Sequence, residues 1–229
     1  MNFLRIMPVE TTEYENLILT LVQDYLNQNK FFNMRKVVSF ISAKLRTYSV
    51  DLNYRAIEEI LRSLTKKKLI DEGTKFTRLD VLNNKKRKQI YDFILKNPGV
   101  YFNTIVRGLK INKPVIVWHI NMLARFDFIK REEFENHEIF FDSRLSALNR
   151  KFRYFTSKEE SKKILEYLKE NDYGITKTHL SMNLGMHHNT ITKYLNKFEE
   201  FNIILKKKVA KRTLYFLNED LIEALNLNT

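Results

Sequence analysis

Hydrophobic and polar positions follow the same order in three segments of the chain, and each segment leads into a short run that is typical of a strand. The segments are residues 56–70 (AIEEILRSLTKKKLI), 115–129 (VIVWHINMLARFDFI) and 190–204 (TITKYLNKFEEFNII). Their second, sixth and ninth positions are apolar, and offsets of four and three residues place these side chains on one face of a helix. The apolar pair that closes each segment indicates the start of a strand. The pattern therefore predicts a structural unit that occurs three times.

The residues around each copy favour the same kind of domain. Two amphipathic helical segments and a polar turn precede each copy, and a charged hairpin follows it. Helix, helix, turn, helix and two-stranded wing is the order of a winged-helix domain, a variant of the helix-turn-helix. We expect a mainly α fold with small β-wings, an α+β architecture of three tandem winged-helix domains. Their predicted bounds are residues 1–82, 83–150 and 151–229, with a helical connector at the end of the second domain.

The sequence also indicates where the wings and the flanking helices lie. The three wings are expected at residues 69–80, 128–142 and 203–216. Residues 157–160 match a capping box, which predicts the start of the first helix of the third domain. A last helix is expected at residues 219–227.

The charge of the chain points to a polyanionic partner. Its 229 residues include 40 Lys and Arg against 27 Asp and Glu, a net charge of +13. The three expected domains carry +3, +6 and +4, so the excess is distributed over the chain. Nucleic acid is the natural partner for such a protein. A generally basic protein without an anionic partner is the alternative.

Several classes of function are disfavoured by what the sequence lacks. It has no Cys, which excludes disulfides and Cys-ligated zinc. No apolar run reaches the roughly 20 residues of a membrane span and no signal peptide is evident, so we expect no membrane partner and a cytoplasmic, nucleoid-associated location. His187 and His188 are neighbours that would point in different directions on a helix, so we expect no metal site. Without a glycine-rich phosphate loop or a nucleophile–base pair, we expect no cofactor and no catalysis.

Two of the three copies resemble a known family, although the third does not retain the His of its motif. Residues 97–129 read NPGVYFNTIVRGLKINKPVIVWHINMLARFDFI and resemble archaeal transcription regulators of the winged-helix class. In that class a helix, N-P-G, a short strand, a small helix and a turn precede a recognition helix with a His-Leu pair. His119 and Ile120 occupy this pair here, and Tyr194 and Leu195 occupy it in LGMHHNTITKYLNKFEEFNII. The resemblance, which in the first copy is limited to hydrophobic spacing, implies sequence-specific binding of double-stranded DNA, often by a dimer.

The fold alone does not decide the function. Winged helices also act as pure protein-binding modules, for example in the endosomal sorting complex II and in the general transcription machinery. The alternative is therefore a protein-interaction scaffold with no specific DNA site. The first two domains are the candidates for a homodimer or another protein contact.

The outward face of the repeated helix differs among the three copies. A recognition helix needs polar and basic residues there, because it bonds base edges and lies near phosphates. The third, fourth, seventh and eighth positions of the first copy are Glu58, Glu59, Arg62 and Ser63. Those of the second copy are Val117, Trp118, Asn121 and Met122. Those of the third copy are Thr192, Lys193, Asn196 and Lys197.

Of these faces, the third has the chemistry that duplex DNA requires. The carboxylates of the first would repel phosphate, and the apolar side chains of the second favour a protein contact or a Trp118 packed beneath the wing. We therefore predict that the third domain is the main DNA reader. Base contacts are expected from its repeated helix, at His188, Asn189, Thr190, Thr192, Lys193 and Asn196, with Lys197 nearer the phosphates. Phosphate or minor-groove contacts are expected from its wing, at Lys206, Lys207, Lys208, Lys211 and Arg212.

A second basic cluster lies in the middle domain. It combines residues 85–88 with Arg107, Lys110 and Lys113, and it is a second candidate for binding phosphate. A solvated surface is the alternative interpretation of both clusters.

Overall fold

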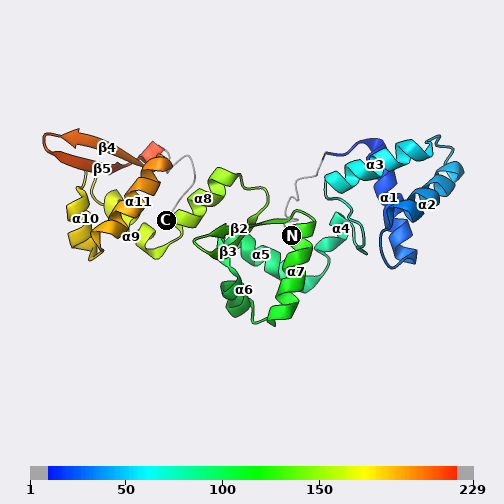
Figure 1. Ribbon diagram of the computed structural model, residues 1–229, viewed down its shortest axis with the longest axis horizontal. Helices are drawn as coiled ribbons and strands as arrows, with labels where there is room; N and C mark the ends of the chain where they lie inside the picture. Colours follow the sequence, from blue (N-terminus) through cyan, green and yellow to red (C-terminus); the bar gives the residue numbers. More distant parts are fainter. Residues whose placement is uncertain (1–9, 221–229) are drawn as a thin grey trace. The chain divides into compact units, whose positions relative to one another are not determined.

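The computed structural model describes residues 10–220, which form two compact units with their boundary between Arg144 and Leu145 (Figure 1). Each unit combines helices with one small antiparallel sheet. The predicted fold class, mainly α with small β elements, is confirmed.

The N-terminal unit begins with three helices that start at polar capping residues. They are α1 (Glu13–Gln28), α2 (Met34–Thr47) and α3 (Tyr54–Lys66). Thr12 and Glu15 form a capping box at the start of α1, and Asn33 and Asn53 cap α2 and α3 through their side-chain oxygens. These side chains satisfy backbone N–H groups that have no partner within the helix, so the local sequence sets where each helix begins.

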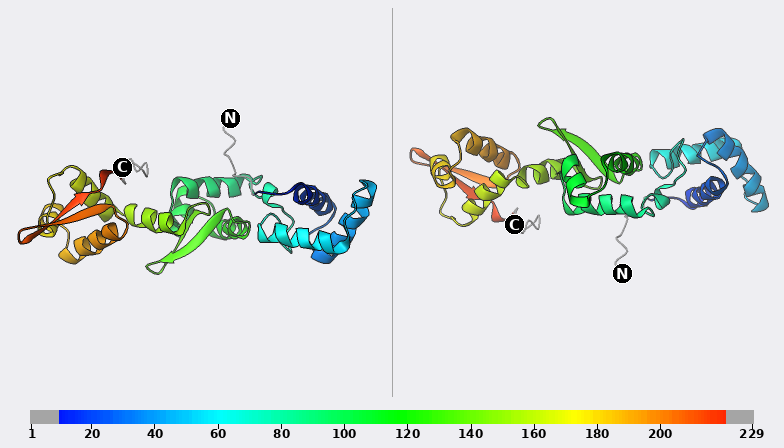
Figure 2. Two further views of the ribbon diagram at one scale, coloured as in Figure 1. Left: turned by 90° about the horizontal axis from the view of Figure 1, so that it is seen from above. Right: turned by 90° about the horizontal axis from the view of Figure 1, so that it is seen from below.

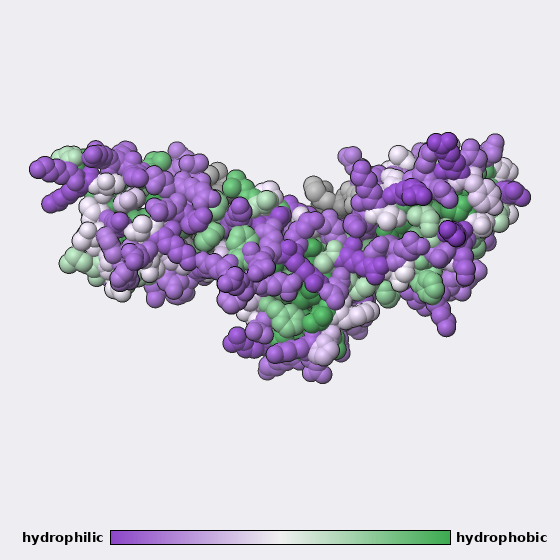
Figure 3. Space-filling model, in the orientation of Figure 1, coloured by the Kyte–Doolittle hydropathy of each residue, from purple (hydrophilic) through white to green (hydrophobic). Residues whose placement is uncertain are grey.

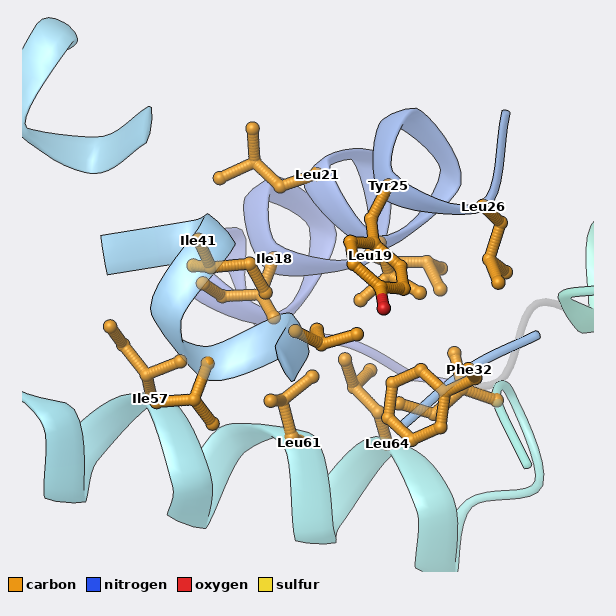
Figure 4. Packing of buried hydrophobic residues seen from close by; sticks show 14 of the residues in the cluster. Ile18, Leu19, Leu21, Tyr25, Leu26, Phe32, Ile41, Ile57, Leu61 and Leu64 are labelled. Carbon is orange, nitrogen blue, oxygen red and sulfur yellow. The ribbon is translucent and has the colours of Figure 1, made fainter. Parts of the chain in front are cut away.

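The three helices enclose one hydrophobic core (Figure 4). The repeat positions Ile57, Leu61 and Leu64 of α3 are fully buried in it, against Ile18 of α1 and Ile41 of α2. The predicted helical stripe is therefore the packing face of α3.

The predicted wing at residues 69–80 is wrong, because no strand forms there. Leu69 and Ile70 are buried in the core of the three helices. The backbone that follows bonds to the loop after α1, with Phe32 N–H donating to Thr74 O at 2.7 Å and Gly73 N–H donating to Phe32 O at 2.9 Å. Since the short helix α4 (Arg78–Val81) follows, the intervening residues do not provide two paired strands. The first copy is thus a helical domain without a wing.

The rest of the N-terminal unit has the order of a winged helix. It contains α5 (Lys85–Lys96), β1 (Val100–Tyr101), α6 (Phe102–Leu109), α7 (Lys113–Arg125), β2 (Ile129–Phe134) and β3 (His137–Asp142). The strands form an antiparallel sheet in the order β1-β3-β2, in which Phe140 of β3 lies opposite Val100 on one side and Arg131 on the other. The wing expected at residues 128–142 is confirmed.

The C-terminal unit contains four helices and a hairpin. They are α8 (Ala147–Thr156), α9 (Glu159–Lys169), α10 (Lys177–Leu184), α11 (His188–Glu200), β4 (Ile204–Val209) and β5 (Arg212–Leu217). Ile175 forms an isolated bridge with Tyr215 of β5. The wing expected at residues 203–216 is confirmed, and in both views of Figure 2 it reaches beyond the helices of its unit.

Helix α8, which corresponds to the helical connector expected after the middle domain, belongs to the C-terminal unit. The rings of Phe152 and Phe155 lie 6.0 and 6.1 Å from the ring of Phe201, which follows α11. These aromatic contacts bury the connector against the third copy. The expected capping box at residues 157–160 is also wrong, because the hydroxyl of Ser157 donates to Tyr154 O at the end of α8. Most of the last helix expected at residues 219–227 lies outside the described residues.

One buried ion pair fixes the start of α1 against the end of α3. The carboxylate of Glu15 accepts hydrogen bonds from Lys67 Nζ at 2.7 Å and Ser63 Oγ at 2.6 Å, and it also accepts from the N–H of Thr12. The bonds from Lys67 and Ser63 lower the pKa of Glu15 to about 2, against an opposing effect of burial.

Replacing Glu15 by Gln should lower the free energy of unfolding by about 2 kcal/mol at neutral pH, because the charge of Lys67 loses its partner. The folded-state pKa is depressed, so this stabilisation is present above the ordinary carboxyl range and is lost as the pH falls toward 2. Thermal unfolding of both proteins across this range measures the difference. Glu59→Gln is the matched control, since Glu59 forms an exposed pair with Arg55. A difference between Glu15→Gln and the natural chain that stays constant with pH would contradict the assignment.

Candidate nucleic-acid interface

Helix α11 separates its side chains cleanly into a buried and an exposed face. Ile191, Leu195 and Phe198 are buried, as the repeat pattern predicts. Lys193 and Asn196 are exposed on the opposite side. On the face shown in Figure 3 the surface of the C-terminal unit is mostly hydrophilic.

The start of α11 is set by the turn that follows α10. Gly185 ends α10 in the left-handed conformation, with φ +62°, and His187 is the N-cap of α11. The N–H of Asn189 donates to Nδ1 of His187 at 3.2 Å. His188 and Asn189 are exposed in the first turn and Thr190 is half-buried. The helix therefore presents these residues at its positive, N-terminal end, where an anion is stabilised.

Several predicted side chains have partners within the unit. The hydroxyl of Thr192, which is half-buried, donates to His188 O at 2.8 Å, and Lys193 Nζ lies 6.0 Å from the centre of the Tyr194 ring. Lys197 forms an ion pair with Glu200 at 2.7 Å and lies 5.4 Å from the ring of Phe155. This ion pair lowers the pKa of Glu200. Lys197 is therefore partly neutralised by an acidic neighbour on its own helix.

Some basic side chains of the wing have a partner within the unit, and others are exposed without a bonded carboxylate in the described part of the chain. Lys206 pairs with Glu199 of α11 at 3.2 Å, and Lys207 lies 5.2 Å from the ring of Phe216. Lys208, Lys211 and Arg212 are exposed around the turn of the hairpin, and within residues 10–220 no carboxylate is bonded to them. The unpaired positive charge of the wing is thus concentrated at its tip.

In the middle domain, α7 presents a different outward face. Val117 and Trp118 are 45% and 48% exposed. Met122 is buried, contrary to the expectation of an outward position, because the eighth position of the repeat lies at the edge of the apolar stripe. Asn121 accepts a hydrogen bond from Arg131 of β2. Trp118 does not pack beneath the wing; the guanidinium of Arg87 lies 5.0 Å from its ring.

The end of α7 is held against the preceding helical domain. Arg125 forms an ion pair with Asp71. A second arginine, Arg78 of α4, extends from the first domain and donates to Phe126 O and to Asp127 O. Its guanidinium lies 4.4 Å from the ring of Phe128. Sequence reasoning missed both arginines, because a single arginine gives no signal that distinguishes docking from solvation.

The basic cluster of the middle domain is not one surface. Arg87 is 1% exposed and donates to Val81 O at 2.8 Å, and burial lowers its pKa. Lys88 pairs with Asp92 at 2.7 Å. Arg107, Lys110 and Lys113 of the α6–α7 region are exposed. The prediction that residues 85–88 form a phosphate-binding run is therefore wrong for Arg87.

Helix α3 of the first domain has the acidic outward face that was expected. Glu59 is exposed and pairs with Arg55 at 3.1 Å, and Glu58 is half-buried. Ser63 turns inward to donate to Glu15. Residues 10–220 contain no cluster of His, Asp and Glu that could hold a metal ion. None of the helices in that range is both apolar enough and long enough to traverse a lipid bilayer.

Comparison with known proteins identifies the class of the middle domain. Residues 84–152 match the family model described as the HVO_0163 N-terminal HTH domain. The match begins at Asn84, the N-cap of α5, and ends within α8, so it spans the complete winged helix. These residues match that model and form a winged helix-turn-helix domain.

One curated relative is an uncharacterized HTH-type transcriptional regulator of Methanocaldococcus jannaschii. It is 30% identical over 145 residues, which cover 62% of this chain and 36% of the relative, so the chain spans about a third of the relative's length. The predicted resemblance to archaeal winged-helix regulators is thereby confirmed. A solved structure of the endosomal complex ESCRT-II covers 91% of this chain and 90% of its own at 12% identity, but its TM-score of 0.23 carries no conclusion.

Replacing Arg78 by Ala should lower the free energy of unfolding of the N-terminal unit by about 2 kcal/mol, because two carbonyls and the face of Phe128 lose their partner. Chemical denaturation followed by circular dichroism measures this loss. Arg62→Ala, which removes an exposed arginine from α3, is the control and should change stability by less than about 0.5 kcal/mol. Equal stability of the two variants would show that Arg78 is not an anchor.

Proposed function

We propose that this chain is a DNA-binding transcription regulator whose C-terminal winged helix is the main reader of double-stranded DNA. Helix α11 enters the major groove with its N-terminal half, and the wing tip lies over phosphates or in the adjacent minor groove. The relationship to an HTH-type transcriptional regulator supports the general role. This role requires neither a catalytic residue nor a cofactor, and it would place the protein in the cytoplasm on the nucleoid.

The observation that carries the proposal is the distribution of charge on α11 and its wing. The exposed face of α11 combines Lys193 and Asn196, and the carboxylates Glu199 and Glu200 stand at the far end of the helix. Each of these two carboxylates has a lysine partner within the unit, Lys206 and Lys197 respectively. Both carboxylates of α11 therefore lie away from its N-terminal half, and the exposed cations of the wing tip add positive charge, which suits a groove lined with phosphates.

The family match lies in the middle domain, so α7 is the competing reader. Two features weigh against it as the main one. Its outward face carries Val117 and Trp118, which offer few hydrogen bonds to base edges. Its C-terminal end is bonded to the first domain through Arg78 and Arg125. Lys113, exposed at the N-terminal end of α7, is suited to a supporting phosphate contact.

The second candidate function is a protein-interaction scaffold. The exposed apolar pair of α7 and the acidic face of α3 favour it, because protein interfaces use aromatic anchors and tolerate carboxylates. A homodimer or a partner bound through the first two domains would be compatible with DNA binding by the third. Selection of bound sequences from a random DNA pool separates the two functions, since a scaffold would enrich no consensus.

Lys193→Glu should weaken binding to the selected DNA by about 10- to 50-fold, because a cation on the recognition face becomes an anion. Lys169→Glu is the matched control, since it makes the same charge change at an exposed position of α9. Gel-shift titration at one fixed salt concentration measures both affinities. Equal losses would overturn the assignment of α11 as the reader, whereas a larger loss in Lys113→Glu would transfer it to α7.

Combined replacement of Lys208, Lys211 and Arg212 by Ala should reduce the slope of log affinity against log salt by about 2 to 3. These side chains would no longer displace counterions from phosphates, and the loss should be similar for all DNA sequences. Lys206→Ala is the control within the same wing, because its charge is already paired with Glu199. An unchanged slope in the triple variant would show that the wing tip does not contact the duplex.

A further inference from the structure

The N-terminal unit contains a pocket of about 680 Å³ that the DNA-binding proposal does not use. Its lining comes from α1, the segment around α4, the start of α5 and the outward face of α7 (Figure 1). The volume lies in the range of sites that bind small molecules. The pocket therefore lies where the first helical domain meets the winged helix that follows it.

A buried cation borders this pocket. Arg87 is 1% exposed, although it carries a full charge, and within residues 10–220 no carboxylate is paired with it. One guanidinium nitrogen donates to Val81 O, and Nε is buried without a hydrogen-bond partner. Such a charge is costly to bury unless an anion compensates it. The guanidinium is held by one carbonyl and two aromatic rings, and no carboxylate of the described residues is bonded to it.

Two aromatic rings that line the pocket lie close to this cation. The guanidinium carbon of Arg87 lies 5.2 Å from the centre of the Phe76 ring and 5.0 Å from that of Trp118. Trp118 is nevertheless 48% exposed, so part of its ring remains available for stacking. Phe76 and Trp118 come from different parts of the unit, which means that the tertiary structure alone creates this aromatic wall.

Apart from Leu26, the remaining lining residues are polar. Asp80 is engaged, since its carboxylate accepts from the N–H and the hydroxyl of Thr77. Asp24, Asn27 and Thr20 of α1 are exposed and line the opposite wall, and Lys75 adds a second cation. This wall can hydrogen-bond to a polar ligand that stacks on the rings.

We propose that this pocket binds a nucleotide-sized small molecule that joins a planar ring to one phosphate or carboxylate group. The ring stacks on Trp118, and the anionic group binds the exposed ammonium of Lys75 beside the positive charge of Arg87. The side chains of Asp24 and Asn27 bond to the polar edge of the ring. The chain thereby has a ligand site that is separate from the proposed DNA-reading helix α11.

Trp118 is the single tryptophan of the chain, so its fluorescence reports directly on the pocket. Titration of the full chain with adenosine monophosphate and, separately, with benzoate should give a saturable change in emission. Adenosine, which lacks the anion, and inorganic phosphate, which lacks the ring, should each bind at least about tenfold more weakly than adenosine monophosphate. No saturable change with either anionic probe, or equal binding of adenosine, would overturn the proposal.

Arg87→Met should weaken binding by about tenfold or more while retaining the packing of the side chain. Arg107→Met, which removes an exposed arginine of α6 outside the pocket, should bind as the natural chain does. Thr20→Tyr offers a variant that does not touch the buried charge, because it fills the mouth of the pocket from an exposed position on α1. Binding that is unaffected by both Arg87→Met and Thr20→Tyr would place the ligand elsewhere. The titrations contain no DNA, so their failure leaves the proposed DNA-binding function standing.

Discussion

Burial of one apolar stripe on the third helix of each repeat is the constraint on which the rest of the molecule depends. Ile57, Leu61 and Leu64 in α3 have counterparts at the same positions in α7 and α11, and all are fully or almost fully buried. Burial of each large apolar side chain stabilises the fold by roughly 1.5–3 kcal/mol. Rotation of the helix about its axis would expose several of these side chains to water and lose their contribution to stability. The orientation of the opposite face follows from this burial. The residues at the third, fourth and seventh positions of the repeat therefore face outward. The three domains differ in the chemistry of these outward residues.

Arginine contributes to this protein in two physically different ways. At the surface it adds to a positive field, but Arg78, Arg87 and Arg125 are used inside the N-terminal unit, on carbonyls, aromatic rings and a carboxylate. Their planar guanidinium groups suit these contacts better than lysine would. The net charge of +13 therefore overstates the charge that is available to a polyanion. In the C-terminal unit, Lys197 and Lys206 form ion pairs with Glu200 and Glu199, so acidic neighbours also offset part of its positive charge.

The contacts between the two domains of the N-terminal unit form a pocket that neither domain would form alone. The helical domain without a wing holds the end of α7, and the pocket between them receives Trp118 together with a buried cation. These contacts fix the C-terminal end of α7 on the first domain, and the outward Trp118 of α7 lines the pocket. We therefore propose that the N-terminal unit binds a ligand and that the C-terminal unit binds the duplex, because Arg78, Arg87 and Arg125 are engaged in contacts within the N-terminal unit.

The sequence by itself determined the helices, their buried faces and two of the three wings, because these depend on local periodicity, capping side chains and turns. It also placed Lys193 and Asn196 on an exposed face, since burial of Ile191 and Leu195 leaves them no other side. Only the tertiary structure decided that residues 69–80 form no wing, because their backbone partner is Phe32, far away in the sequence. In the same way it decided that α8 packs on Phe201 and that Arg87 is buried close to the rings of Phe76 and Trp118. These outcomes depend on contacts between distant residues, for which a single sequence carries no periodic signal.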